Sequence, residues 1–270
     1  MPELPEVETS RRGIEPWILN TRIADVVVRD RRLRWPVARG IESRLRGRRI
    51  ESVGRRAKYL LIGTDDGTAI VHLGMTGSVF IVDHDAPAGV HDHFDILLDS
   101  GRSLRFRDPR RFGSFFFSKK PLAHPLLAEL GPEPLGDDFD GEYLWRRSRG
   151  RKVSVKQFIM NAKVVVGVGN IYASESLFLA GINPKRAAGR ISRHRYDALA
   201  DAIRDVLGRA IQAGGTTLRD FYGGDGEPGY FRQELEVYDR EGEHCRFCNT
   251  VIRAIVQGQR TTYYCNSCQT

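Results

Sequence analysis

Two stretches, Cys245-Arg246-Phe247-Cys248 and Cys265-Asn266-Ser267-Cys268, hold all four cysteines of this 270-residue chain. Their spacing, C-x2-C-x16-C-x2-C, lies in the range of a tetrahedral zinc site made of four thiolates. Two disulfides are the alternative, but a cytosolic chain with no other cysteine argues against them. A redox pair is also disfavoured, because no thioredoxin-like βαβ pattern surrounds either C-x-x-C. We therefore expect a zinc finger with Cys245, Cys248, Cys265 and Cys268 as the ligands of one structural Zn²⁺ ion.

The residues between the cysteine pairs include Gln259-Arg260-Thr261-Thr262, which favours a basic hairpin tip held by the metal. Residues 245–270 contain no acidic side chain with which Arg260 could pair. The alternative is an exposed arginine that is simply solvated.

The region before the finger has helical periodicity, with apolar residues at i, i+3 and i+4 in residues 155–160, 171–180 and 194–213. Val166-Gly167-Val168-Gly169-Asn170 separates the first two helices and is too rich in glycine for a helix interior. A turn of this kind lets backbone amides approach a phosphate. Taken alone, Gly-Val-Gly-Asn is a weak signal, because most such turns are only turns.

The N-terminal half predicts an antiparallel β-sandwich or barrel-like domain after a short helix at residues 6–18. Its short β-branched or alternating runs are residues 23–28, 59–62, 69–73, 78–82, 94–98 and 114–117, separated by polar turns. An acidic stretch rich in glycine and proline, residues 131–138, is typical of a linker. The expected class is α+β, with a β-rich domain at 1–130, a linker at 131–149, a helical domain at 150–235 and the finger at 236–270.

The charge of the chain is +8 and unevenly distributed. Residues 29–58 hold twelve basic and three acidic side chains, residues 144–163 hold seven basic and no acidic ones, and residues 129–142 hold six acids and no bases. Such basic blocks suit a polyanion, because neutralised phosphates release counterions. Solvated arginines are the equal alternative, since 35 of the 42 basic residues are arginine. No apolar run reaches the ~18 residues of a membrane span, and MPELPEVETS does not resemble a secretion signal, which predicts a cytoplasmic protein.

The N-terminal Met1-Pro2-Glu3 is the most unusual feature. Removal of Met1 exposes the secondary amine of Pro2, and an α-amine holds far more free base at neutral pH than a lysine does. Such an amine attacks an electrophilic sugar carbon while the neighbouring Glu3 donates a proton. With Met1 retained, Pro2 is an amide and no nucleophile. From these residues alone, two prolines that merely stiffen the chain remain the simpler interpretation.

Six segments in order, spanning Pro2 to Cys268, resemble bacterial formamidopyrimidine-DNA glycosylase. They are Pro2-Glu3-Leu4-Pro5-Glu6-Val7-Glu8-Thr9, Arg56-Ala57-Lys58-Tyr59-Leu60, His72-Leu73-Gly74-Met75-Thr76-Gly77, Asp108-Pro109-Arg110-Arg111-Phe112-Gly113, Gly167-Val168-Gly169-Asn170-Ile171-Tyr172-Ala173 and the four-cysteine module. The resemblance implies an N-terminal β-sandwich with flanking helices, a central helix–two-turn–helix domain and a C-terminal zinc finger. It implies a monomeric enzyme that excises 8-oxoguanine and formamidopyrimidines from duplex DNA and cleaves the abasic site by β,δ-elimination, without a small-molecule cofactor.

The resemblance also assigns roles to residues. Pro2 forms a Schiff base with the sugar, Glu3 is the acid, Lys58 contacts phosphate near the lesion and assists elimination, and Arg260 grips the phosphates beside the flipped nucleotide. Backbone contacts come from His91, Lys152, Lys156 and Asn170. The gap left in the base stack is filled by Met75, Arg110 and Phe112. The glycine-rich stretch after residues 214–217 is expected to hold the lesion.

Simpler interpretations accompany several of these residues. Met75 and Phe112 are core residues in most proteins, although each stands next to a glycine in an expected turn. His91 and His93 suggest a metal site, but no third ligand of suitable spacing lies near them.

Arg110 is expected to prefer cytosine opposite the lesion, since it donates two hydrogen bonds to the acceptors O2 and N3.

Two rival functions fit part of the sequence. A non-catalytic zinc-finger DNA-binding protein explains the basic blocks and the cysteines, but it does not need Pro2, Glu3 and Lys58. The sister glycosylase of oxidised pyrimidines shares the Pro-Glu start and the finger. That relative usually has glycine where this chain has Leu4, and it lacks the continuation Val7-Glu8-Thr9.

Overall fold

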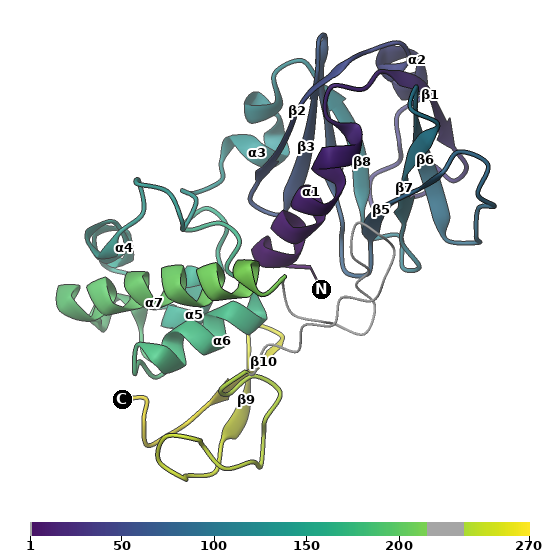
Figure 1. The fold of residues 1–270 in the computed structure, drawn as a ribbon. Coiled ribbons are helices and arrows are strands. Elements are labelled where there is room, and N and C mark those ends of the chain that lie inside the picture. The colour runs from purple at the N-terminus through teal and green to yellow at the C-terminus, as the bar shows by residue number, and fades with distance from the viewer. Residues whose placement is uncertain (1, 215–234) are drawn as a thin grey trace. The chain divides into compact units, whose positions relative to one another are not determined.

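The computed structural model describes residues 2–214 and 235–270 (Figure 1). The chain forms two compact units, the first running to Ala128 and the second beginning at Glu129 and including the C-terminal residues. Within the described residues, no helix is long and apolar enough to cross a membrane. The expected α+β class is confirmed.

The first unit contains two four-stranded antiparallel sheets, with strand orders β1-β6-β7-β5 and β2-β3-β4-β8 (Figure 1). The six predicted strands are all present. The strands are β1 (Ile23–Val28), β2 (Ile50–Arg56), β3 (Tyr59–Thr64), β4 (Gly67–His72), β5 (Ser78–Asp83), β6 (Asp92–Leu98), β7 (Arg102–Arg107) and β8 (Ser114–Ser118).

One apolar core joins both sheets to helix α1 (Leu4–Ile18), which confirms the predicted sandwich. In β3 every second residue is buried, as expected for a strand with one face on a core. The rings of Phe94 and Phe115, from different sheets, stack with centroids 4.1 Å apart. Short helices complete the unit: α2 (Ile41–Leu45), the 3-10 helix η1 (Pro121–Ala123) and α3 (Pro125–Ala128).

Strands β2 and β7 were not predicted because both are rich in arginine. Arg105 in β7 is only 3% exposed, yet it is paired. Its Nε and Nη2 lie 3.0 and 2.9 Å from the two carboxylate oxygens of Asp95 in the neighbouring strand β6. Arg105 lies on the face of β7 opposite the core residues Leu104 and Phe106, and its bidentate pair with Asp95 allows a charged side chain to be buried there.

The second unit consists of helices and a C-terminal hairpin that contacts one of them. The helices are α4 (Gly141–Ser148), α5 (Val155–Ile159), α6 (Asn170–Leu179), the 3-10 helix η2 (Ala188–Arg190) and α7 (Arg193–Gln212). The predicted helices correspond to α5, α6 and α7. Helix α4 was missed and lies inside the stretch 131–149 that we expected as linker. Asp140 is the N-cap of this helix, and its Oδ1 accepts a hydrogen bond from Tyr143 N at 2.6 Å. One acid of the acidic stretch therefore starts a helix.

The glycine turn between α5 and α6 is present where the sequence predicted it. Gly167 has φ +78°, a left-handed conformation that favours glycine. Residues 164–169 are buried, so this turn is packed into the unit. Asn170 follows as the first residue of α6, where its amide lies at the positive end of the helix dipole.

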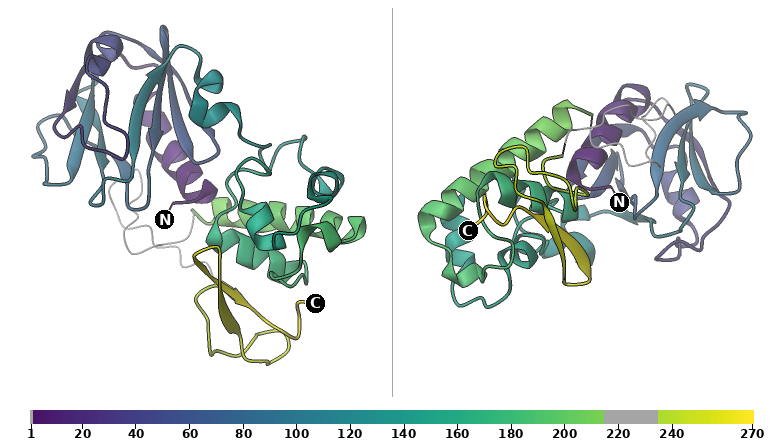
Figure 2. Two further views of the ribbon diagram at one scale, coloured as in Figure 1. Left: turned by 180° about the vertical axis from the view of Figure 1, so that it is seen from behind. Right: turned by 90° about the horizontal axis from the view of Figure 1, so that it is seen from below.

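The C-terminal module is a hairpin of β9 (Arg253–Gln257) and β10 (Arg260–Tyr264) packed next to α6 (Figure 2). Its small core combines Phe178 of α6 with Val237, Ile252 and two of the cysteines. The buried carboxylate of Glu175 in α6 accepts hydrogen bonds from three consecutive backbone amides, those of residues 236–238, at 2.8 to 3.0 Å. The start of the module is thereby fixed to the helix.

Candidate functional site

The N-terminal residues Pro2 and Glu3 are buried at the start of α1. Glu3 is the N-cap of the helix and exchanges hydrogen bonds with Glu6, whose Oε2 accepts from the Glu3 amide at 2.7 Å. This reciprocal capping box fixes the backbone on both sides of Glu3. The nitrogen of Pro2 therefore adjoins a rigid helix start, with a carboxyl group on the next residue.

Lys58 lies in the tight turn between β2 and β3, after Ala57 with φ +54°, and is partly buried. Its charge acts on His72, at the end of β4. Burial, with the positive charges of Lys58 and Arg34, lowers the pKa of His72 to about 4. The neutral imidazole accepts a hydrogen bond at Nδ1 from the amide of Gly74 at 3.0 Å.

His72 is a residue that the sequence analysis did not single out. Its position two residues before Gly74, in the segment of residues 72–77, was the available signal. The hydrogen bond to Gly74 links the surroundings of Lys58 to the turn that carries Met75.

Met75, Arg110 and Phe112 lie in two turns of the first unit, residues 73–77 and 108–113. Met75 and Phe112 are each 38% exposed, so neither is a core residue. Arg110 is exposed as well, and its guanidinium lies over the Phe112 ring, 4.8 Å from the centroid. Arg110 and Phe112 thus form a mixed cationic and apolar surface, and Met75 is exposed in a turn whose Gly74 lies against the backbone of Phe112.

His91 and His93 have different environments. His91 is exposed just before β6, whereas His93 is 1% exposed and makes a hydrogen bond through Nε2 to the carbonyl oxygen of Asp108 at 2.7 Å. Within residues 2–214 and 235–270, neither histidine belongs to a group of three or more potential metal ligands. The metal interpretation of this pair thus finds no support, and His91 remains a candidate for a phosphate contact.

Lys156 differs from our expectation of a direct phosphate contact. Its side chain is fully buried, and Nζ donates to Asn170 Oδ1 at 2.7 Å, Thr262 Oγ1 at 2.9 Å and the Thr261 carbonyl at 3.2 Å. Asn170 also donates from Nδ2 to the Thr261 carbonyl at 3.0 Å. The lysine thus joins α5, α6 and β10, and it places the partly exposed Asn170 amide beside the hairpin.

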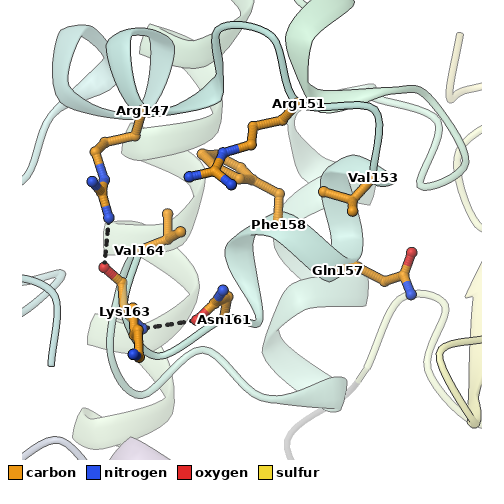
Figure 3. A pocket seen from close by; sticks show the side chains of 8 residues that line it. All are labelled: Arg147, Arg151, Val153, Gln157, Phe158, Asn161, Lys163 and Val164. Carbon is orange, nitrogen blue, oxygen red and sulfur yellow. Dashed lines mark hydrogen bonds between the residues drawn. The ribbon is translucent and has the colours of Figure 1, made fainter. Parts of the chain in front are cut away.

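Lys152 is exposed in the loop before α5, next to a basic pocket of about 320 Å³ (Figure 3). The pocket has an apolar wall and a rim of Arg147, Arg151 and Lys163, and no acidic residue of the described part of the chain lines it. The backbone carbonyl of Lys163 accepts a hydrogen bond from Arg147 at 3.1 Å.

Arg260 is exposed and opens strand β10 at the tip of the hairpin, paired in register with Gln257. The predicted hairpin is therefore confirmed. The expected lesion-holding stretch after residues 214–217 lies outside the described residues.

The four cysteines converge, with their sulfur atoms all within 4.8 Å of one another. Cys245 Sγ and Cys268 Sγ are 3.9 Å apart, and Cys248 Sγ and Cys265 Sγ are 3.4 Å apart. A tetrahedral site with Zn–S bonds of about 2.3 Å requires sulfur separations of about 3.8 Å, whereas a disulfide requires about 2.05 Å. The donor set and the separations fit a four-coordinate metal ion.

Comparisons with known proteins agree on one family. The model of the formamidopyrimidine-DNA glycosylase N-terminal domain matches residues 1–115, and the model of its H2TH domain matches residues 130–222. A formamidopyrimidine-DNA glycosylase of Stutzerimonas stutzeri is 62% identical over 269 residues, covering 100% of both chains. The MutM (Fpg) structure from Thermus thermophilus has a TM-score of 0.88 at 37% identity, covering 99% of this chain and 98% of that one. Lactococcus lactis Fpg in complex with DNA containing an abasic site has a TM-score of 0.90 at 31% identity, covering 100% of each.

Proposed function

Since the chain belongs to the formamidopyrimidine-DNA glycosylase family, we propose that it excises oxidised purines from duplex DNA as a monomer and cleaves the resulting abasic site through a Schiff base on Pro2. As a member of this family, the chain is a DNA glycosylase of base-excision repair, and its partner is DNA. The observation that supports Schiff-base chemistry on Pro2 is the placement of Pro2 and Glu3 at a capped helix start. A binding module has no need of such an arrangement.

The proposed chemistry begins when the Pro2 nitrogen, freed by removal of Met1, forms a bond to C1′ of the damaged nucleotide. The glycosidic bond breaks and its electrons leave with the base. The departing base and the sugar oxygen each take up one proton; Glu3 supplies one of them, and the Pro2 nitrogen, which loses its own proton, supplies the other. Opening of the sugar ring gives an iminium that acidifies the C2′ proton. Loss of that proton expels the 3′ phosphate, and a second elimination expels the 5′ phosphate, with Lys58 assisting beside the phosphate.

The damaged base must leave the stack before its sugar is attacked. We assign Met75 and Phe112 as apolar wedges in the vacated space, supported by their exposure in adjoining turns. Arg110 faces the orphaned base and donates to O2 and N3 of cytosine. Adenine presents a donor at N6 in that place, so excision opposite adenine is disfavoured.

Phosphate contacts are assigned to exposed or partly exposed groups, His91, Lys152, Asn170 and Arg260. Lys156 is assigned a positioning role instead, because its ammonium is engaged by Asn170 and by the hairpin. The metal is proposed to be Zn²⁺, which four thiolates in this spacing select. It closes the finger and keeps Arg260 at its tip.

Borohydride trapping on a duplex with 8-oxoguanine opposite cytosine tests the proposal. We expect DNA linked to the N-terminal peptide of the wild-type protein and of the variant Lys58→Met, as identified by mass spectrometry. A link to Lys58 with Pro2 unmodified overturns the assignment. Faster excision of thymine glycol than of 8-oxoguanine favours the sister enzyme of oxidised pyrimidines.

A further inference from the structure

Asp108 is a fully buried carboxylate at the end of β7, with no place in the proposed chemistry. Its Oδ1 accepts the hydroxyl of Thr76 at 2.6 Å and the amide of Arg110 at 3.2 Å. Its Oδ2 accepts the amide of Gly113 at 2.7 Å. A single side chain therefore holds the turn of residues 73–77 and both ends of the turn of residues 108–113.

The backbone of Asp108 holds a third segment. Its amide donates to the carbonyl of His91 at 3.0 Å, and its carbonyl lies 2.7 Å from His93 Nε2. Because a carbonyl oxygen only accepts, His93 carries its proton on Nε2. The segment with the exposed His91 is thus attached to the same residue.

The two turns also touch directly. Gly74 has φ +73°, and a Cβ at that position would lie 2.4 Å from the carbonyl carbon of Phe112. A Cβ at Gly113 would lie 2.8 Å from the His72 carbonyl oxygen. Neither glycine can gain a side chain unless the turns separate, so the backbones are in close contact at these two positions.

We propose that Asp108 is a positioning residue, and that it joins the turns of Met75 and of Arg110 with Phe112 into one preformed wedge. The proposal rests on the roles given to these three side chains above. A wedge on separate mobile turns would lose conformational freedom on entering the duplex, and this loss would weaken insertion. The buried carboxylate removes that freedom in advance, and it sets the direction from which Arg110 meets the orphaned base.

We call the hydrogen bonds from Asp108 to the two turns the clamp. Thr76 is the better residue with which to test it, because replacing Asp108 itself leaves several buried donors without an acceptor. Thr76→Val keeps the shape and removes the hydroxyl, whereas Thr76→Ser keeps the hydroxyl. Thr64→Val is the matched control, since the Thr64 hydroxyl donates to the Gly67 carbonyl in a different turn, at 2.8 Å.

The first readout is single-turnover excision of 8-oxoguanine opposite cytosine and opposite adenine. We expect Thr76→Val to reduce the preference for cytosine about tenfold, the effect of one misplaced hydrogen bond. Thr76→Ser and Thr64→Val should retain the wild-type preference. If Thr76→Val retains it too, while the wild type discriminates, the clamp does not position Arg110.

The second readout is hydrogen exchange in the free protein, which requires no activity. Thr76→Val should accelerate exchange in peptides covering residues 73–77 and 108–113 together, and Thr64→Val in neither. Acceleration confined to residues 73–77 overturns the proposal, whatever the activity. A wild-type enzyme without cytosine preference would overturn the role of Arg110, and the exchange result would then decide the clamp by itself.

Discussion

The guanidinium of Arg110 covers the ring of Phe112, with Cζ 4.8 Å from the ring centroid. A cation over an aromatic face is favourable by about 0.5–1 kcal/mol at an exposed site. The contact therefore stabilises the positions of both side chains in the free protein. On insertion, the ring is expected to exchange the guanidinium for a base, which frees Arg110 to reach the orphaned partner.

Phe112→Ala should weaken binding to a duplex with an abasic-site analogue by at least about fivefold, because stacking of a base on an aromatic ring contributes about 1–3 kcal/mol. Phe112→Trp should retain most of the affinity. The control is Leu122→Ala, which removes another exposed apolar side chain, 64% exposed, from the first unit. Fluorescence anisotropy titrations measure all four proteins, and equal affinity of Phe112→Ala and wild type would remove Phe112 from the wedge.

Glu3→Gln should abolish base excision and keep part of the cleavage at preformed abasic sites, because no base has to leave there. Glutamine retains an acceptor oxygen for the helix cap, so the fold is preserved. Glu6→Gln is the matched control within the same capping box. Rates on both substrates are compared by gel electrophoresis. An equal loss of both activities in Glu3→Gln, or the same loss in Glu6→Gln, would assign Glu3 to another step.

Lys152 and Lys156 should behave differently when each is replaced by methionine. Lys156→Met deprives buried polar groups of their donor and should reduce the free energy of unfolding by about 3 kcal/mol. Lys152→Met should leave stability unchanged and lower the log–log salt dependence of DNA binding by ~0.9, the effect of one phosphate contact. Urea titration and binding at several salt concentrations provide the two measurements, and a stable Lys156→Met protein would contradict the positioning role.

Metal removal should unfold the finger. Cys248→Ser leaves three thiolates, and we expect it to lose both the metal and DNA binding, because Arg260 loses its support. Ser267→Ala, an exposed change between two ligands, is the control. Elemental analysis should find one zinc ion in the wild type and the control. A metal-free preparation that binds and cuts DNA normally would refute the structural role.

His72 should make stability dependent on pH. Its pKa in the folded protein is about 4, against 6.5 for an unperturbed histidine. Since the folded state resists protonation, the contribution of the neutral ring is fully present above pH 6.5 and is lost as pH falls towards 4. The stability difference between wild type and His72→Gln should shrink over that range. Thermal melts at several pH values measure this difference, and His84→Gln, a change at an exposed histidine, is the control. A stability difference that does not change with pH would exclude the titration of His72 as its cause.

The sequence predicted the sandwich, the helices around the glycine turn and the finger because their signals are local. Alternating apolar residues define strands such as β3, and cysteine spacing defines the metal site. Strand β7 was missed because Arg105 is neutralised by Asp95, a partner ten residues away. The burial of Lys156 was not predicted for a similar reason, since its acceptors Thr261 and Thr262 are more than a hundred residues distant. A charged residue whose partner is remote in sequence looks like a surface residue.

Glu175 gives the finger a second attachment that does not depend on metal. Its carboxylate holds the amides of residues 236–238 to helix α6, upstream of the first cysteine. We therefore expect chelation to loosen the cysteine-bearing ends of the hairpin first, while residues 236–238 stay on α6 and Lys156 still contacts Thr261 and Thr262. The metal-free protein is then a partly unfolded enzyme with an intact body and a loose end that a protease cuts first.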